Sequence, residues 1–396
     1  MGTSRSHHDV AVVGARVAGA SVALLLARMG HDVVVLERSQ FPSDTLSTHG
    51  IARSGVVQLA RWGLLDRVLE SGAPAIRTVT FHVDGEATER RVKDRAGVDH
   101  LIAPRRHLLD PIIAAAAVDA GADVRFGTTV TGVRRDGRGR VTGVCARDAR
   151  GETLEIDARV VIGADGLRSR VARSVGAPFL ESRPATGAAH YAYYGDTEWN
   201  GIEFFVGEGL GGIFPTHGGE ACVWVCSPVD VALAARRGTD SLDAALDRLV
   251  ARAAPGLADR LAGATRTSAA QGVVGMANQV RGAHGPGWAL VGDAAYHRDA
   301  VTGHGMSDAF RDAELLAEAL DPALRGDADV DAALAAYDDR RRAALHDIFD
   351  ITCALAAYPP PVEFVAQQRL LSAAIEAEAT WLAARPVPGA RTLAGV

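Results

Sequence analysis

Three segments of the chain each contain a short apolar run that is followed directly by a carboxylate, and each segment also has one or more glycines in a turn after an apolar run. The carboxylates are Glu37, Asp165 and Asp293. A short apolar run between turn residues is typical of a buried strand, and an open α/β sheet binds its ligands beyond the carboxyl ends of its strands. A carboxylate there can bind a sugar hydroxyl, and glycine lets the backbone approach a phosphate. We therefore expect one nucleotide site built from three distant segments.

The first segment, Asp9 to Arg38, predicts a βαβ unit. Its parts are a strand at 9–13, a tight turn from Gly14 to Gly19, a helix at 20–29 and a second strand at 31–36. The turn and the first N–H groups of the helix would hold a pyrophosphate. Arg16 stands where the G-x-G-x-x-G pattern has its middle glycine, and its guanidinium can itself reach phosphate. Glu37, about 20 residues beyond the turn, can bind a ribose hydroxyl. Taken alone, this stretch could also be an α/β turn without a ligand.

The other two segments repeat the arrangement of strand, acidic residue and helix. The run 159–164 predicts a strand that ends at Asp165 and Gly166, with arginines beyond it and a helix capped near Ser169. The run 288–292 predicts a strand that ends at Asp293, followed by a glycine-spaced loop and a helix from about Met306 to Leu320. The start of that helix would present N–H groups to a polar ring edge.

The rest of the chain suggests a second sheet and a helical tail. Residues 184–275 hold short alternating strands at 190–194, 202–206, 212–214 and 221–226, which predict an antiparallel sheet that covers a cavity. Helices are expected at 329–356 and 362–384. The loop from Ser47 to Gly50, which includes Thr48 and His49, either lines the active site or is a solvated loop that ends in a helix cap.

Composition excludes several classes of protein. A net charge of −6 over 396 residues gives no broad basic surface for nucleic acid. No apolar run approaches the roughly 20 residues of a membrane span, and the first eight residues lack an apolar signal core, so we expect a cytoplasmic protein with no membrane span. The four cysteines contain no C-x-x-C pair, and we expect neither a zinc site nor a dithiol centre.

Taken in this order, the motifs resemble the FAD-dependent monooxygenases of the para-hydroxybenzoate hydroxylase type, whose relatives include the geranylgeranyl reductases and the flavin halogenases. The resemblance runs from Asp9 to about Leu320 and includes an R-x-x-L that begins at Arg105. It implies an α/β fold, with a Rossmann-like FAD-binding domain of the glutathione-reductase type, an inserted antiparallel β-sheet substrate domain and a helical C-terminus. The implied divisions are 1–76, 103–183 and 276–325 for FAD, 77–102 and 184–275 for substrate, and 326–396 for the C-terminal helices.

The resemblance also implies roles for single residues. The implied FAD contacts are Gly14, Ala15, Arg16, Ala18 and Gly19 at the pyrophosphate, Glu37 and Arg38 at the adenosine, Arg105 along the FAD chain, Val130 at the adenine, Asp165 and Gly166 at FAD and the reduced nicotinamide, Asp293 at the ribityl chain, and Gly303, His304, Gly305 and Met306 at the isoalloxazine ring. Three positions depart from the family pattern: Tyr296 replaces a histidine, Ala300 lies where proline is frequent, and His304 replaces a glutamine. These departures bear on substrate type and flavin movement rather than on FAD binding.

The implied function is an NAD(P)H-driven monooxygenase that uses O₂ and hydroxylates an aromatic or polyketide-like small molecule through a flavin C4a-hydroperoxide, with NADPH or NADH as a transient reductant. Because the flavin supplies the chemistry, no side-chain nucleophile is needed. A base near neutral pKa would assist a phenol, and the candidates are His49, His190, His217 and His304. The candidates for the substrate cavity are Tyr191, Tyr193, Phe205, Phe214 and Trp224, with plain sheet core as the alternative.

Three other functions stay open. A prenyl or other double-bond reductase would share the turn and the Gly-Asp motif but consume no oxygen. A halogenase needs a reactive lysine, and the single lysine, Lys93, lies in a polar turn. A flavin-binding partner protein without turnover is the third.

Overall fold

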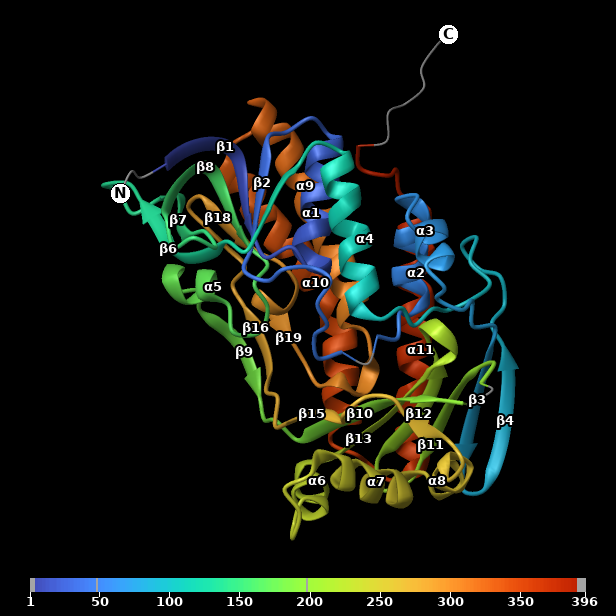
Figure 1. The fold of residues 1–396 in the computed structure, drawn as a ribbon. Coiled ribbons are helices and arrows are strands. Elements are labelled where there is room, and N and C mark those ends of the chain that lie inside the picture. The colour runs from blue at the N-terminus through green and yellow to red at the C-terminus, as the bar shows by residue number, and fades with distance from the viewer. Residues whose placement is uncertain (1–3, 48, 197–198, 390–396) are drawn as a thin grey trace.

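The computed structural model describes residues 4–47, 49–196 and 199–389, and its first sheet holds the strands of all three motifs, β18, β8, β1 and β2, in consecutive positions (Figure 1). Its order is β17-β18-β8-β1-β2-β5, and β6 and β7 extend it from β8. The strands β1, β2, β5, β8 and β18 pair in parallel. The bounds are β1 Ser4–Val13, β2 Val33–Glu37, β5 Asp123–Phe126, β6 Thr129–Arg135, β7 Val141–Arg147, β8 Thr153–Gly163, β17 His284–Gly285 and β18 Trp288–Leu290.

The central strands of this sheet are buried on both faces, which explains why they are apolar throughout rather than alternating. All five residues of β2 are buried. The sheet and its helices share one core, to which α1, α4 and α9 contribute leucines, an isoleucine and a phenylalanine. The bounds of the helices in this part are α1 Val17–Arg28, α2 Arg53–Arg61, α3 Leu65–Glu70, α4 Arg106–Asp119, α5 Arg170–Val175 and α9 Gly305–Arg325. The expected α/β class is confirmed.

A second sheet lies below the first in Figure 1 and takes its strands from two distant parts of the chain. Its order is β14-β10-β13-β12-β11-β3-β4, with β15 also paired to β10. Its pairs are antiparallel except for β11 with β3, which run parallel. The bounds are β3 Thr78–Val83, β4 Glu86–Arg91, β10 Gly187–Gly195, β11 Ile202–Val206, β12 Leu210–Pro215, β13 Ala221–Pro228, β14 Thr265–Arg266 and β15 Gln271–Val274.

Each face of the second sheet packs on helices. One face shares a core with α10 (Val330–Ala356) and α11 (Pro361–Ala383), and the other packs on α6 (Val229–Ala235), α7 (Leu242–Ala253) and α8 (Pro255–Leu261). Helix α7 ends before Ala254, and Pro255 begins α8, where its missing backbone N–H is tolerated. A small third sheet, β19-β16-β9, is formed by Tyr296–His297, Asn278–Arg281 and Phe179–Arg183.

The two C-terminal helices are long and run alongside the first sheet and its helices. In Figure 1, α10 and α11 extend from the first sheet to the second. Contacts join α11 to α2 and α10 to α9. Among the described residues, none of the helices is both long and apolar enough to cross a membrane.

Candidate active site

The three motif strands end at one cavity of about 770 Å³. This volume lies in the range of small-molecule and cofactor sites, roughly 300–1,000 Å³. Of the predicted FAD contacts, the cavity is lined by Gly14, Arg16, Ala18, Glu37, Arg38, Val130, Asp165, Gly166, Asp293, Gly303, His304, Gly305 and Met306. The structure therefore brings together residues that are up to 292 positions apart in the chain, from Gly14 to Met306.

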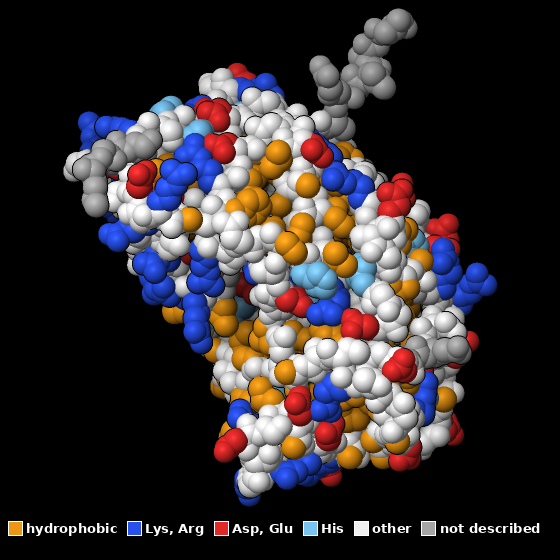
Figure 2. Space-filling view, viewed as in Figure 1, with side chains coloured by type: hydrophobic (Ala, Val, Ile, Leu, Met, Phe, Trp, Pro, Cys, Tyr) orange, Lys and Arg blue, Asp and Glu red, His pale blue; other side chains and the backbone are white. Residues whose placement is uncertain are grey.

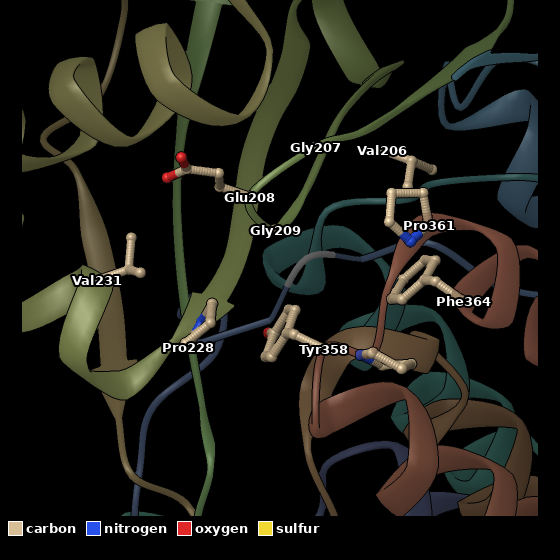
Figure 3. Close-up of a pocket in the computed structure, with 10 residues that line it drawn as sticks. Val206, Gly207, Glu208, Gly209, Pro228, Val231, Tyr358, Pro361 and Phe364 are labelled. Carbon is tan, nitrogen blue, oxygen red and sulfur yellow. The ribbon is translucent and has the colours of Figure 1, made fainter. Parts of the chain in front are cut away.

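A smaller hollow of about 260 Å³ lies elsewhere, between the β11–β12 turn and the start of α11 (Figure 3). Its wall includes Tyr358 and Phe364, and it contains none of the predicted site residues. The larger cavity is thus the candidate active site.

The turn between β1 and α1 has no room for side chains at its two glycines. A Cβ on Gly14, which has φ +102°, would lie 2.6 Å from the carbonyl oxygen of Ala164, and a Cβ on Gly19 would lie 1.9 Å from that of Gly14. No side chain caps the first turn of α1, so its N–H groups are free to bind an anion. Gly19 does not line the cavity; its role is to let α1 pack closely on the turn.

Glu37 ties this turn to the end of β2. Its two carboxylate oxygens accept hydrogen bonds from the backbone N–H of Ala15 at 2.9 Å and of Ser39 at 2.8 Å. Ala15 therefore acts through Glu37 and is not part of the cavity wall. Each oxygen keeps a further lone pair, so Glu37 can still accept a ribose hydroxyl.

Arg16 is held by protein groups. Its guanidinium donates to Asp110 at 2.8 Å and to the Ser43 hydroxyl at 3.1 Å. The fully buried Asp110 also binds Arg106 through two hydrogen bonds of 2.8 and 3.1 Å. Arg16 thus fixes the turn against α4, while its side chain still lines the cavity.

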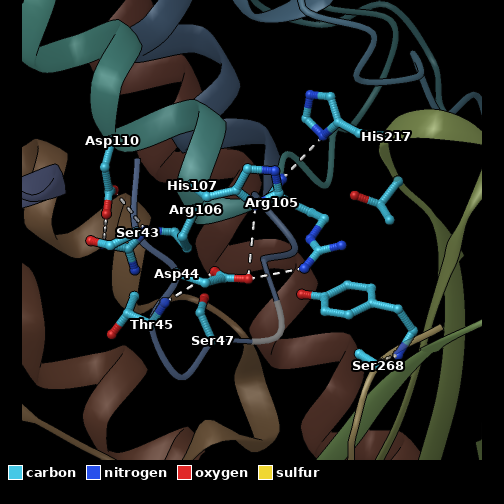
Figure 4. A network of polar contacts seen from close by, with 12 residues as sticks. Ser43, Asp44, Thr45, Ser47, Arg105, Arg106, His107, Asp110, His217 and Ser268 are labelled. Carbon is cyan, nitrogen blue, oxygen red and sulfur yellow. Dashed lines mark hydrogen bonds and ion pairs between the residues drawn. The ribbon is translucent and has the colours of Figure 1, made fainter. Parts of the chain in front are cut away.

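The structure places Arg106, and not Arg105, at the cavity. Arg105 instead pairs with Asp44 at 3.1 Å (Figure 4). It also pairs with Glu220 at 2.8 Å, and its guanidinium lies 3.9 Å from the ring centre of Tyr193. The R-x-x-L spacing fits both arginines, because leucine follows three positions after each. The predicted location of Arg105 is corrected accordingly.

Asp165 and Gly166 form the rim of the cavity beside α5. The Asp165 carboxylate accepts from the backbone N–H groups of Arg170 at 2.6 Å and Val171 at 3.2 Å, and from the Ser169 hydroxyl. Ser169 in turn caps α5, as expected, by accepting from the N–H of Ala172.

Asp293 lines the cavity, and its side chain is exposed there. Enclosure away from bulk water raises the pKa of Asp293 to about 6, against the opposing pull of Arg106. Gly303 has φ +60° with no atom within 4 Å of an added Cβ. Its neighbour His304 begins α9 without a side-chain capping bond. A carboxylate and free helix-start N–H groups therefore face the same space.

His304 is fixed by a residue that the motifs did not indicate. Its Nε2 lies 2.8 Å from a carboxylate oxygen of Glu378 on α11, whose other oxygen lies 2.8 Å from Arg311. Arg311 also pairs with Asp308, 2.9 Å away. All four side chains are at least nine-tenths buried. Nothing in the sequence near Glu378 marks it as part of the site.

His49 is the other histidine at the cavity. It has a positive φ of 62° and only 1% of its surface is exposed. Its ring stacks on Tyr193 with centres 5.5 Å apart and meets the edge of Tyr191 at 6.0 Å. Burial lowers the pKa of His49 to about 3, although Asp44 opposes this. Within the described residues, neither ring nitrogen has a hydrogen-bond partner.

The other two histidine candidates lie away from the cavity. His217 accepts from the backbone N–H of Arg105 at 3.2 Å and bonds the Ser71 hydroxyl at 2.9 Å. His190 is buried in β10, where desolvation and Arg236 lower its pKa. Neither lines the cavity. Thr48 lies outside the described residues.

Only Tyr191 of the five aromatic candidates lines the cavity. Tyr193 lies behind His49, and Phe214 and Trp224 belong to the core of the same sheet face. Phe205 is corrected to the opposite face, where its ring stacks on His82 at 4.2 Å. Apolar side chains that line the cavity include Leu46, Ala189, Val273, Met276 and Ala300.

Known proteins resemble the chain over most of its length. Residues 7–352 match the family described as FAD binding domain. Menaquinone reductase of Mycolicibacterium smegmatis is 32% identical over 327 residues, which cover 78% of this chain and 75% of that protein. Digeranylgeranylglycerophospholipid reductase 2 of Methanopyrus kandleri is 29% identical, over 84% of this chain and 81% of the relative.

Solved structures extend the similarity to three dimensions. The structure of pqsL, a probable FAD-dependent monooxygenase from Pseudomonas aeruginosa, is 26% identical with a TM-score of 0.75, covering 92% of this chain and 100% of that one. The flavin-dependent brominase Bmp2 has a TM-score of 0.80 at 20% identity, over 96% of this chain and 93% of that one. That second likeness concerns the fold alone.

Proposed function

Because the chain belongs to the FAD-binding-domain family of oxidoreductases and monooxygenases, we propose that it is an NAD(P)H- and O₂-dependent monooxygenase that hydroxylates a small aromatic or polyketide-like molecule. FAD is the cofactor of the family. We further propose that the first sheet and its helices bind FAD and that the second sheet forms the substrate unit, along the divisions expected from the sequence.

The residues at the cavity fit FAD. The uncapped start of α1 suits the diphosphate, Glu37 the adenosine ribose, Arg106 and Asp293 the chain between diphosphate and ring, and the start of α9 the ring edge. Bound FAD supplies the redox and oxygen chemistry. The protein then has to orient the substrate, exclude water and hold the substrate's proton.

The observation that carries the proposal is the wall formed by His49 and Tyr191. Since burial lowers the pKa of His49 to about 3, its imidazole is neutral near pH 7 and keeps one acceptor nitrogen without a partner among the described residues. Both ring nitrogens are buried, so in the proposed complex the ring turns toward the cavity to present that nitrogen. Such a nitrogen can accept the O–H of a phenol, which increases electron density on the ring carbons that are to be oxidised. Tyr191 holds this wall in place, because its hydroxyl donates to Gln271 at 3.0 Å.

The test uses the FAD-loaded protein with a panel of phenols, quinones and polyene lipids. We expect a phenol to stimulate NADPH and O₂ consumption together, with a product that gains one oxygen atom. The variant His49→Phe should keep the FAD spectrum but lose most of the phenol-stimulated rate. The proposal is overturned if no compound in the panel yields a product that has gained an oxygen atom from O₂.

A second candidate is reduction of a prenyl double bond. It is favoured by the two curated relatives described above, whose names are those of reductases and whose matched regions cover three quarters or more of both chains. In that case a polyene lipid would gain two hydrogen atoms and no O₂ would be consumed. The same panel therefore separates the two functions.

A further inference from the structure

Acidic side chains are scattered among basic ones over the surface of the molecule (Figure 2). Water solvates a carboxylate at the surface, so the lack of a partner there indicates nothing. A buried carboxylate is different, because its charge is costly unless a cation and hydrogen bonds compensate for it. A buried carboxylate that lacks a cation and faces a cavity therefore indicates a group that a ligand supplies.

Seven carboxylates are buried in the part of the chain that the structure describes, and all but two of them pair with arginine. The five paired carboxylates, at 2.7–3.3 Å, belong to Asp110, Asp308, Asp312, Glu314 and Asp338. The other two, Glu37 and Asp299, both line the cavity. Glu37 accepts two backbone N–H groups and is proposed to bind the adenosine ribose. Asp299 is thus the buried carboxylate whose charge is left without compensation.

The contacts of Asp299 use only one of its two carboxylate oxygens. Oδ1 accepts from the backbone N–H of Val301 at 3.0 Å and so caps the short helix Ala300–Thr302. Among residues 4–47, 49–196 and 199–389, no donor reaches Oδ2, and no arginine, lysine or histidine nitrogen lies within 4.0 Å of the carboxylate. Asparagine caps a helix as well as aspartate does. The cap therefore does not explain a negative charge at this position.

The surroundings of Asp299 are uncharged. The side chain is 5% exposed, and burial raises its pKa with only the N–H of Val301 in opposition. The titratable groups that it influences are those of Cys226 and Tyr358, which are both neutral near pH 7. Its neighbour Arg298 is paired with Asp308 at 2.7 Å. A cation that binds Asp299 has to come from outside the chain.

Strand β10 leaves room for this carboxylate. A Cβ on Gly187, the first residue of β10, would lie 2.0 Å from Oδ2 of Asp299. Alternate residues share one face of a strand, and on this face Ala189 and Tyr191 follow Gly187 and line the cavity. Val273, which pairs with Ala189 across the sheet, lines it as well. Asp299 therefore lies at one end of an apolar wall, and Tyr191 lies at the other.

We propose that Asp299 binds a protonated amine of the substrate, and that the substrate carries this basic nitrogen at the end opposite its phenolic hydroxyl group. The inference rests on the proposed function, in which His49 accepts the hydroxyl group beside Tyr191. A protonated amine supplies both the positive charge and the N–H donors that Oδ2 lacks. A carboxylate at the same end of a substrate would meet a like charge and be disfavoured.

The spacing of the two ends sets the length of the substrate. Gly187 and Tyr191 are four positions apart, which is about 13 Å at about 3.3 Å per residue. Side chains reach into the cavity at both ends, so a molecule that spans them is about 10 Å long, the length of two linked or three fused aromatic rings. A single ring cannot engage Asp299 and His49 together.

The experiment uses the FAD-loaded protein and three biphenyl-4-ols that differ only in the substituent at C4′: aminomethyl, methyl or carboxylate. Dissociation constants are measured at pH 7 by calorimetry and from the change in flavin absorbance. The variant Asp299→Asn removes the charge and keeps an acceptor for the N–H of Val301. The control Asp347→Asn removes a negative charge from an exposed position of α10 that does not line the cavity.

We expect the unaltered protein and the control to bind the aminomethyl compound about tenfold or more tightly than the methyl compound, since a hydrogen bond to a charged group corresponds to at least that factor. The carboxylate compound should bind most weakly. In Asp299→Asn the aminomethyl and methyl compounds should bind within about threefold of each other, with affinity for the methyl compound unchanged.

Two results would overturn the inference. One is equal binding of the aminomethyl and methyl compounds by the unaltered protein, which needs no variant and decides the matter even if Asp299→Asn does not fold. The other is an equal loss of affinity for both compounds in Asp299→Asn, which would assign the residue a structural role in the cap.

Failure of the inference can be told from failure of the proposed function, because binding is measured without turnover. The same three compounds are then incubated with the enzyme, NADPH and O₂, and the products are weighed by mass spectrometry. Oxygenated products without a preference for the amine contradict the inference alone. A preference for the amine without any oxygenated product contradicts the monooxygenase proposal alone.

Discussion

The buried pair between Glu378 and His304 predicts that Glu378→Gln strongly destabilises the protein. The side chains of Glu378, His304 and Arg311 are 9%, 0% and 1% exposed. Removing one partner of such a buried group typically costs 3–5 kcal/mol, because the remaining charge is left without compensation. Glutamine keeps one acceptor oxygen and Arg311 keeps Asp308, so we expect the lower end, about 3 kcal/mol. Urea unfolding of the apoprotein at pH 7 measures it.

The matched control is Glu376→Gln on the same helix. Glu376 pairs with Arg53 at 2.7 Å but is 28% exposed, and we expect a loss of about 1 kcal/mol or less. A double-mutant cycle with His304→Gln should show coupling of about 1 kcal/mol or more between His304 and Glu378. Equal losses in the two glutamate variants, or an unchanged cost of Glu378→Gln in the His304→Gln background, would refute the reasoning.

The effect should also depend on pH with a defined sign. Although burial alone would raise it, His304 and Arg311 hold the pKa of Glu378 well below the usual glutamate range. A lowered folded-state pKa gives stability that is fully present above the unfolded-state value, about 4.3, and is lost as pH falls through the folded-state value. The difference in unfolding free energy between wild type and Glu378→Gln should therefore be constant from pH 6 to 7 and shrink below about pH 4. A difference that grows on acidification would contradict this assignment.

Three further predictions concern the FAD site. Enclosure raises the pKa of Asp293 to about 6, so the folded apoprotein binds the proton of this carboxyl more tightly than the unfolded chain does. The free energy of unfolding should therefore rise as pH falls from 7 to about 4. In thermal melts Asp293→Asn should remove that rise, and the variant should also bind FAD more weakly. Arg106→Leu should raise the FAD dissociation constant about tenfold or more in fluorescence titrations, whereas Arg105→Leu should leave it within about threefold. Gly14→Ala should abolish FAD retention on gel filtration, since its Cβ would lie 2.6 Å from the carbonyl oxygen of Ala164; a yellow, FAD-retaining alanine variant would contradict the close-packing argument.

Where the sequence was sufficient, the signal was local. The strand that leads to Glu37, the glycine turn before α1 and the helix after Gly303 each follow from apolar runs and glycines within about 10–20 consecutive residues. The chain-wide order of these motifs was enough to predict an α/β fold around FAD. It was also enough to predict that three distant carboxylates share one site, because the carboxyl ends of parallel strands lie at one edge.

Where the sequence was not sufficient, the answer depended on a partner far along the chain. The R-x-x-L spacing fits two adjacent arginines, and only the start of α4 at Arg106 decides which one faces the cavity. Alternation in a strand gives two faces but not which face is inward, so Phe205 could not be separated from Tyr191 before the sheet was placed.

The role of Glu378 shows the same limit most clearly. It lies 74 positions from His304, in a helix whose sequence carries no motif, and it becomes part of the site only because α11 packs against α2 and brings its carboxylate to the start of α9. Backbone conformation and strand ends are set by neighbours in the chain, and the sequence therefore determined the FAD-binding frame. The groups that hold, neutralise or orient each side chain are chosen by the packing of distant segments, and only the tertiary structure decided those.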